Sequence, residues 1–390
     1  MRLQSWGITA LLYALTTLSM ATVGVLVPFM AHLSFILHAS PAQIGIAIAC
    51  FSLPSAILAT VGGAVIDAVG VRRAIVVSGL YAMCGDALAC AAPSIAPFDL
   101  ALLLCGVAFA GISVAAPAMI VEAMAGAPQI RAMSFWSTYA PTGYAMGLLM
   151  TVPFLAGDGW KAAMLVHGVL MAIGTASAMA LPSPVRRPAA AAPRARLSLR
   201  GLGAIFRDGP TLRLGIAVAL PNGISYGTSL VAPTYLARAH DVGLAASSTT
   251  VALAKIFAMI VGGVVTGQLL ARQINPRRLF LALAGLGCIA QVLLYAPASS
   301  FAVAAGALIV WLFAFGGMAG GAMAQLPLVV GDRAHTGLAS GLIGQLISVA
   351  SFCAPPLYFG LTNWVGYCAV ALVGLLVSAW AIPAVAPRKA

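Results

Sequence analysis

Two ionisable side chains lie deep within long apolar stretches of this sequence, where a charge is costly unless it is paired or hydrated. Lys255 interrupts an apolar stretch in the second half of the chain, and Asp86 interrupts one in the first half. An ammonium group in such a place is suited to binding a carboxylate or another small anion, and a carboxyl group is suited to carrying a proton. The alternatives are a lysine that extends to the membrane surface and a neutral, hydrogen-bonded aspartic acid.

His167 is a second candidate for carrying a proton, although a hydrogen-bonded structural histidine would fit the same position. The seven cysteines are scattered through apolar segments without the spacing of metal ligands, which indicates small buried side chains rather than disulfides. We therefore predict no metal site and no cofactor.

The composition excludes a soluble domain. Hydrophobic residues account for 62% of the 390 residues and charged residues for 7%, and the mean hydropathy is +1.04. Soluble chains carry roughly 25% charged residues, so most of the outer surface of this protein must face lipid. The sequence predicts an all-α membrane protein.

Charge and turn clusters divide the chain into twelve apolar spans, each long enough to cross a hydrocarbon core of roughly 30 Å as a helix. The predicted spans are 6–36, 42–66, 74–94, 99–124, 132–156, 160–181, 211–236, 247–270, 279–296, 299–330, 336–361 and 365–385. Residues 182–210, rich in Pro, Ala and Arg, predict a cytoplasmic basic linker between an N-terminal six-helix bundle (1–181) and a C-terminal one (211–390). Val61-Gly62-Gly63 recurs as Val261-Gly262-Gly263, which indicates an internal repeat.

The net charge of +12 is explained by topology. With the amino terminus in the cytoplasm, 17 basic residues lie on the cytoplasmic side, Lys161 and Arg238 lie on the other, and Lys255 lies within a span. Because this asymmetry follows the positive-inside rule, we predict cytoplasmic termini and the bacterial inner membrane as the location. A nucleic-acid partner is not expected.

The loop after the second predicted span carries a recognisable motif. It reads Gly63-Ala-Val-Ile-Asp67-Ala-Val-Gly70-Val-Arg72-Arg73. This loop resembles the signature loop of the major facilitator superfamily, and the resemblance in span number and central linker covers the whole chain. It implies that Asp67, Gly70 and Arg72 help to hold the cytoplasmic side closed; the alternative is that the two arginines only signal topology.

The boundary between the fourth and fifth predicted spans is also similar to that family. It contains Pro117 and Glu122, followed by Pro128 and Arg131. Glu122 and Arg131 can pair across this short loop as a cytoplasmic latch; the alternative is a Glu122 that is simply a solvated helix end.

The family resemblance implies two pseudo-symmetric six-helix bundles that move about a central cavity. It places the span of Lys255 at that cavity, together with polar and aromatic side chains that can hold a solute by hydrogen bonds and stacking, although each is also a reasonable packing residue. These candidates are Tyr13, Thr17, Tyr139, Tyr144, Asn222, Tyr226, Trp311 and Gln345. We also expect the Pro221-Asn222-Gly223 run to interrupt its span and to expose backbone groups.

The predicted function is secondary transport of a small organic metabolite, anionic or zwitterionic, by alternating access in a monomer. Its partners would be the solute, membrane lipids and protons, since the chain has no Gly-Lys-Ser/Thr nucleotide loop. A proton-coupled efflux pump for drugs is the alternative, although Cys105-Gly106 and Ala140-Pro141-Thr142-Gly143 differ from the family's drug antiporters. A lipid-modifying membrane enzyme is a remote alternative, for which His240-Asp241 is the only local candidate.

Overall fold

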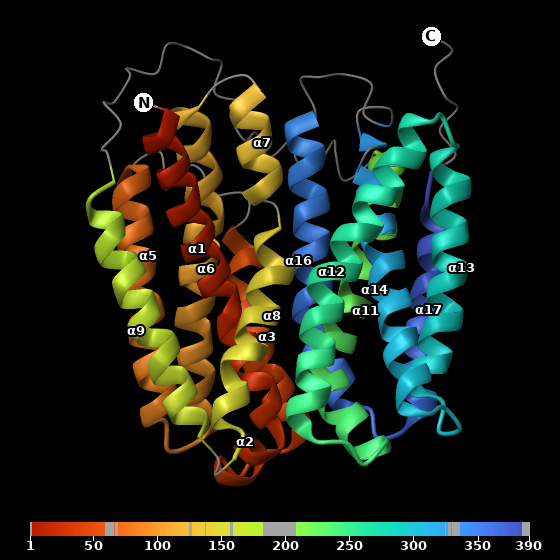
Figure 1. The fold of residues 1–390 in the computed structure, drawn as a ribbon, viewed down its shortest axis with the longest axis horizontal. Coiled ribbons are helices and arrows are strands. Elements are labelled where there is room, and N and C mark those ends of the chain that lie inside the picture. The colour runs from red at the N-terminus through yellow and green to blue at the C-terminus, as the bar shows by residue number, and fades with distance from the viewer. Residues whose placement is uncertain are drawn as a thin grey trace. The chain divides into compact units, whose positions relative to one another are not determined.

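A computed structural model of the chain consists of long helices joined by short turns (Figure 1), and no strand occurs in the part that it describes. That part comprises residues 2–58, 66, 69–124, 127–136, 138–156, 159–181, 208–323, 325–326, 329 and 336–383. The fold class predicted from composition is confirmed.

The long helices of the first half pack against one another (Figure 1). They are α1 (Arg2–Leu26), η1 (Val27–Phe29), α2 (Met30–Ile36), α3 (Pro41–Leu58), α5 (Val71–Ala91), α6 (Ile95–Ala123), α7 (Ala127–Trp136), α8 (Tyr139–Thr151), η2 (Val152–Phe154) and α9 (Trp160–Met179). Those of the second half are α11 (Gly209–Ala239), α12 (Leu244–Ala271), α13 (Pro276–Tyr295), α14 (Phe301–Met323), α16 (Thr336–Gly360) and α17 (Trp364–Ala381).

Ten of the described helical segments are long and apolar enough to cross a membrane, and a shorter apolar helix covers Pro41–Ile57. The membrane fold is therefore confirmed, whereas the number of twelve spans stays a prediction. One reason lies in the predicted span 132–156, which is divided into α7 and α8. Pro141 is the third residue of α8 and has no N–H to donate to the preceding turn, which favours the start of a new helix at this point.

The expected interruption at Pro221 is wrong, because α11 runs unbroken from Gly209 to Ala239. Pro221 cannot donate a hydrogen bond to the carbonyl of Ala217, one turn earlier. The hydroxyl of Ser378 on α17 donates to that carbonyl instead, over 2.8 Å. A neighbouring helix thus replaces the missing bond, and the helix tolerates the proline.

Glycines bring helices of the first half close together. A Cβ atom at Gly147 of α8 would overlap the carbonyl of Ala21 on α1, and one at Gly24 of α1 would overlap the carbonyl of Tyr144. A similar close contact joins α12 to α14, where a Cβ atom at Gly262 would overlap the carbonyl of Phe313. Small residues at such crossings allow the backbone contact on which helix association in membranes depends.

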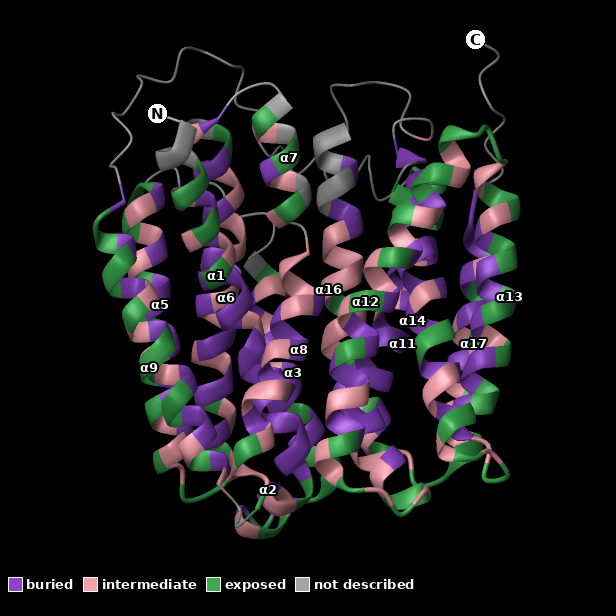
Figure 2. Cartoon of the chain, viewed as in Figure 1, coloured by how far each residue is buried: buried purple, intermediate pink, exposed green. Residues whose placement is uncertain are grey.

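Burial follows the helix faces (Figure 2). On α9, Leu165, Val169 and Ile173 recur every four residues and are 58–61% exposed, which makes an apolar outer stripe suited to lipid. On the same helix, Met164, His167 and Met171 are fully buried. A helix that exposes an apolar face and buries a histidine on another face differs from a surface helix of a soluble protein, which exposes its polar face.

The chain forms two compact units. Unit 1 comprises Met1–Ala190 with Gly243–Ala252, and unit 2 comprises Ala191–Val242 with Leu253–Ala390.

Candidate functional site

The predicted substrate-binding lysine lies in unit 2, on α12. Lys255 is 7% exposed, and its Nζ donates a hydrogen bond of 2.6 Å to the hydroxyl of Ser229 on α11. Ser229 in turn donates to the carbonyl of Ser225, over 2.6 Å. The hydroxyl of Ser229 thus positions the ammonium group of Lys255, and an ammonium group can form charge-assisted hydrogen bonds with an anion.

Polar side chains continue from Ser229 along one face of α11. Asn222, Tyr226 and Ser229 are spaced by three and four residues, so they follow one stripe of the helix. Asn222 donates from Nδ2 to the hydroxyl of Ser351 on α16, over 2.9 Å. The stripe spans roughly 10 Å by helical rise, which is the length of a small metabolite.

Two other predicted residues of unit 2 have different surroundings. Trp311 is fully buried on α14 and packs against Gly287 of α13, where a Cβ atom would lie 3.0 Å from its ring. Its indole Nε1 has no acceptor among the described residues. Gln345 is half-buried on α16. The structure brings neither into contact with Lys255 by a described hydrogen bond, so their role in binding stays a prediction.

In unit 1, α1 is joined by hydrogen bonds to the break between α7 and α8. The hydroxyl of Tyr13 lies 3.1 Å from that of Thr138 and donates to that of Thr142 over 3.0 Å. Trp136 donates from Nε1 to the hydroxyl of Thr16, over 3.3 Å. Thr17, the next residue, is buried, and its hydroxyl has no partner among the described residues.

Tyr139 belongs to a row of aromatic rings in unit 1. Phe51 stacks on Phe109 with 5.3 Å between ring centroids, and Tyr139 lies 6.1 Å from Phe109 and 4.7 Å from Trp136. The row joins α3, α6, α7 and α8. Tyr144, one turn further along α8, is fully buried.

The two candidates for carrying a proton meet in unit 1. His167 Nδ1 lies 2.8 Å from Oδ2 of Asp86, with 0% and 4% of the two side chains exposed. The other ring nitrogen, Nε2, lies 2.8 Å from the carbonyl oxygen of Leu18 on α1. Cys105 of α6 donates from Sγ to Oδ1 of Asp86, over 3.7 Å. Four helices therefore contribute to one buried polar cluster.

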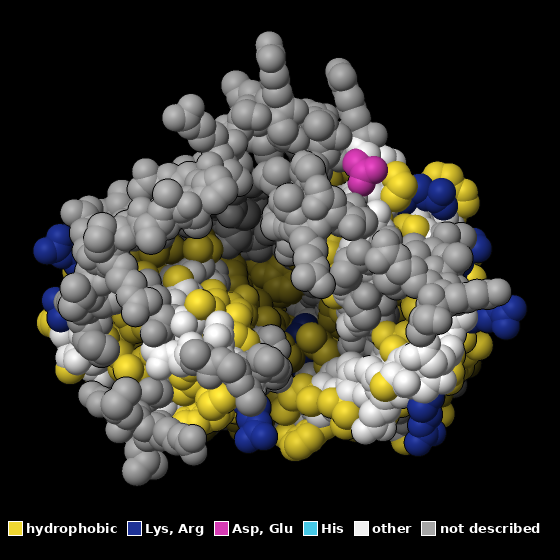
Figure 3. Space-filling view, turned by 90° about the horizontal axis from the view of Figure 1, so that it is seen from above, with side chains coloured by type: hydrophobic (Ala, Val, Ile, Leu, Met, Phe, Trp, Pro, Cys, Tyr) yellow, Lys and Arg dark blue, Asp and Glu magenta, His cyan; other side chains and the backbone are white. Residues whose placement is uncertain are grey.

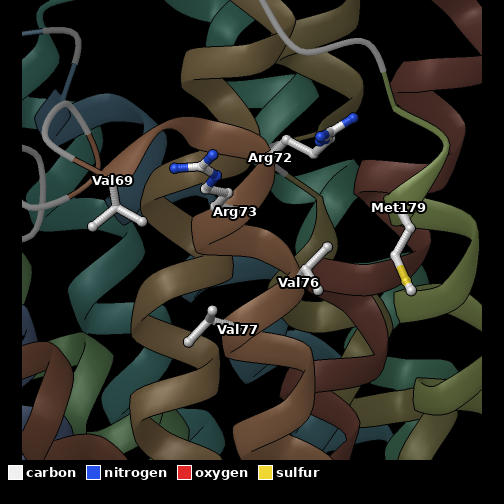
Figure 4. A pocket seen from close by; sticks show the side chains of 6 residues that line it. All are labelled: Val69, Arg72, Arg73, Val76, Val77 and Met179. Atoms are coloured by element: carbon white, nitrogen blue, oxygen red, sulfur yellow. The ribbon is translucent and has the colours of Figure 1, made fainter.

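The motif at the start of α5 is described in part. Gly70 has φ of 93°, a conformation that favours glycine, directly before the helix. Arg72 donates from Nη1 to the carbonyl of Leu181 after α9, over 3.3 Å. Arg72 and Arg73, with apolar residues of α5 and α9, line an open depression of about 310 Å³ (Figure 4). Gly63 and Asp67 lie outside the described residues.

The second predicted gate is described only on one side. Arg131 is exposed on α7, whereas the side chain of Glu122 lies outside the described part of the structure. Their pairing stays a prediction. In the described ranges no group of three or more His, Cys, Asp or Glu side chains could hold a metal ion.

The partners of these groups are what sequence reasoning missed. Ser229 could have been found, because it continues the spacing of Asn222 and Tyr226 on α11. The carbonyl of Leu18 could not, because no pattern along the chain marks a backbone oxygen that accepts from a side chain 149 residues away.

Comparisons with known proteins extend over most of the chain. A sequence model of the major facilitator superfamily matches residues 10–355. The fold is similar to a mutant of the nucleoside transporter NupG, with a TM-score of 0.76, 15% identity, and coverage of 96% of this chain and 98% of that one. No curated protein sequence matches the chain.

Two further solved structures share the fold. One is a bacterial homolog of the human lysosomal transporter Spinster, with a TM-score of 0.73, 15% identity, and coverage of 97% of this chain and 94% of that one. The other is the xylose transporter XylE from E. coli, with a TM-score of 0.74, 13% identity, and coverage of 97% and 96%. At these identities the likeness concerns the fold alone.

Proposed function

Because the chain belongs to the major facilitator superfamily, we propose that it is a secondary transporter of a small organic metabolite, anionic or zwitterionic, across the inner membrane. The family assigns transport rather than catalysis, so the enzyme alternative falls away. Residues 1–181 and 211–390 would act as two bundles joined by the linker 182–210, and alternating access would expose a central site to each side in turn.

The observation that carries the substrate class is the buried ammonium group of Lys255. Ionisable groups inside membrane spans are rare and commonly belong to substrate pathways, and an ammonium group is suited to binding a carboxylate. Ser229 positions this cation at one end of the polar stripe of α11. A carboxylate bound to Lys255 would leave the rest of a small solute within reach of Tyr226 and Asn222 along that stripe.

Counterflow into proteoliposomes tests the substrate class. The purified full chain is reconstituted with a panel of labelled monocarboxylates, dicarboxylates, zwitterionic amino acids, neutral sugars and nucleosides. We expect exchange of a carboxylate or an amino acid and none of the neutral solutes. Exchange of neutral solutes alone would refute the anionic class while leaving transport itself intact.

A specific observation also supports the alternative of an amphipathic cargo. The aromatic row of Phe51, Phe109, Tyr139 and Trp136 in unit 1 offers stacking surface of the kind that planar organic compounds use. In this alternative the chain is a proton-coupled efflux pump. Ethidium added to the same proteoliposome assay distinguishes the two, since an efflux pump would transport this dye and a carboxylate transporter would not.

We also propose membrane lipids as partners at the start of α5. The depression near Arg72 and Arg73 is otherwise lined by Val69, Val76, Val77 and Met179. Figure 4 shows the two guanidinium groups above these apolar side chains. A lipid phosphate can pair with an arginine while an acyl chain covers the valines.

We also propose which ends of the helices face the cytoplasm. In unit 1, the first turn of α5, which carries Arg72 and Arg73, and helix α7, which carries Arg131, lie toward the same end of the helices (Figure 1), and Figure 3 views the molecule from that side. In unit 2, Arg277 and Arg278 lie in the first turn of α13. The positive-inside rule would place these ends in the cytoplasm.

A further inference from the structure

The hydrogen bonds of His167 determine how many protons its cluster holds. Nε2 faces the carbonyl oxygen of Leu18, which can only accept a hydrogen bond, so Nε2 carries a proton. Nδ1 faces Oδ2 of Asp86 at 2.8 Å, a distance at which one proton must lie between the two atoms. The pair is therefore an imidazolium with a carboxylate, or a neutral imidazole with a carboxylic acid. Both forms hold the same number of protons and have no net charge.

Removing one proton leaves the imidazole with a single N–H. That N–H can serve Asp86 or the carbonyl of Leu18 but not both. The carboxylate is the stronger acceptor because it is charged, so the bond to Leu18 is the one that must break.

Helix α1 also presents a second group, the hydroxyl of Thr22, that can form a hydrogen bond with Nε2 of His167 in place of the Leu18 carbonyl. The hydroxyl of Thr22 lies 3.5 Å from Nε2 of His167 and donates to the carbonyl of Ser19, over 3.2 Å. A bare Nε2 is an acceptor, so the Thr22 hydroxyl can turn and donate to it. The two protonation states thus favour two different contacts between α9 and α1, one helical turn apart.

We propose that Asp86 and His167 form a one-proton binding site, and that its occupancy selects between the Leu18 carbonyl and the Thr22 hydroxyl as the contact of His167 with α1. This inference rests on the proposed transport function only for its consequence, which is proton coupling. Helix α1 also carries Tyr13 and Thr17, so a displacement of α1 would reach the predicted substrate residues of unit 1.

Among the described residues, the groups that are hydrogen-bonded to Asp86 and His167 from other helices are uncharged. Helix α6 presents the Cys105 thiol to Asp86, and α1 presents only Leu18 and Thr22 to the imidazole. On α5, the thiol of Cys90 lies one turn from Asp86 and donates to the carbonyl of Lys161, over 3.8 Å. Lys161, the second residue of α9, is exposed.

The equivalent position in unit 2 has a group that does not titrate. Asp86 and Gln291 each lie 15 residues after the first residue of their helices, α5 and α13. Gln291 is also fully buried, and its amide exchanges hydrogen bonds with the hydroxyl of Thr228 on α11. One half thus holds a proton site where the other half holds an amide, which makes unit 1 the place for proton chemistry.

Solid-state NMR of the full chain in liposomes, labelled with ¹⁵N-histidine, tests the proposal without any substrate. The His167 signals are assigned by their loss in His167→Gln. We expect both ring nitrogens to be protonated, or to share a proton with Asp86, near neutral pH, and Nε2 to become bare in one step as pH rises. A bare Nε2 at every pH, or no change up to the pH at which the protein unfolds, would overturn the proposal.

Two variants separate this switch from a structural contact. Thr22→Val removes the donor that serves the deprotonated state, so deprotonation should require a pH higher by up to about one unit. Ser19→Ala is the matched control, because the Ser19 hydroxyl donates to the carbonyl of Thr16 and should leave the titration unchanged. Equal titration curves for Thr22→Val and Ser19→Ala would contradict the Thr22 contact.

The coupling of transport to proton movement is measured separately in proteoliposomes, with a solute that the counterflow panel has shown to be exchanged. Asp86→Asn should retain counterflow and lose accumulation driven by a pH gradient. Thr228→Val, which removes the partner of Gln291, should retain both. If Asp86→Asn still accumulates solute against the gradient, the pair carries no coupled proton. The NMR titration stays informative even if no solute is exchanged, so failure of the transport proposal is distinguishable.

Discussion

At the scale of single residues, the value of Lys255 depends on where its charge lies. The ammonium group of Lys255 is 7% exposed and donates to the hydroxyl of Ser229, so water screens its charge only weakly. Lys161, in contrast, is exposed at the start of α9, with its Nζ 5.5 Å from the centroid of the Trp160 ring. Both residues carry an ammonium group and they differ in burial, so a substitution of Lys161 is a suitable control for the same substitution of Lys255.

We predict that Lys255→Gln strongly reduces exchange of the anionic solute, with a loss of roughly 30- to 150-fold in transport efficiency, because a buried charge-assisted bond is worth about 2–3 kcal/mol. The measurement is initial-rate counterflow at equal protein content. Lys161→Gln should retain the parent rate. Unchanged kinetics in Lys255→Gln would remove this residue from the site.

At the scale of helices, the crossing of α1 and α8 depends on the absence of side chains. A Cβ atom at Gly147 would meet backbone atoms of Ala21 and Val25, which cannot move aside without shifting the helix. Gly267 on α12 has no atom within 4 Å of its Cβ position. The same substitution therefore has opposite consequences at the two glycines.

We predict that Gly147→Ala destabilises the protein by about 1–3 kcal/mol through overpacking. Gly267→Ala should be neutral or stabilising, since alanine favours the helix by up to about 1 kcal/mol. Thermal unfolding of the purified variants in one detergent compares them. Equal melting temperatures would mean that α1 and α8 do not cross at Gly147.

The start of α5 permits a test of the lipid contact. Arg73→Gln should reduce the anionic phospholipid that copurifies, by roughly two- to tenfold, because one phosphate contact near the surface is worth about 1 kcal/mol. Arg278→Gln, at the start of α13, is the control. Native mass spectrometry measures the bound lipid, and equal retention in both variants would reject this depression as a lipid site.

At the scale of the whole molecule, we predict that the distribution of basic residues sets the orientation in the membrane, with both termini in the cytoplasm. Helix α11 has 31 residues, so its ends are about 45 Å apart and lie on opposite sides of a bilayer. Gly209 at its start and Gly243 after its end are both exposed, with space for a side chain.

A membrane-impermeant maleimide applied to intact cells should label Gly243→Cys and not Gly209→Cys. Broken cells should label both, and the parent chain reports labelling of its native cysteines. The reverse pattern in intact cells would invert the orientation, and with it the side on which Arg72 and Arg73 act.

The sequence by itself determined the solvent, the class of fold and the positions of the rare charges. Hydropathy and helix length are local properties, so the membrane helices can be predicted from consecutive residues. Gly70 was also predictable, because the need for a positive φ before α5 follows from the turn itself. The family followed from local motifs and their order along the chain.

Only the tertiary structure decided which of these groups meet. Asp86 and His167 are 81 residues apart, and either alone had a structural interpretation; together with Leu18 they define a proton count. The continuity of α11 through Pro221 likewise depends on Ser378, 161 residues from the carbonyl that it satisfies. The physical reason is that apolar helices carry little information about their neighbours, since lipid and protein solvate them almost equally well. Partner choice is made by close contacts and by buried hydrogen bonds between segments far apart in the chain.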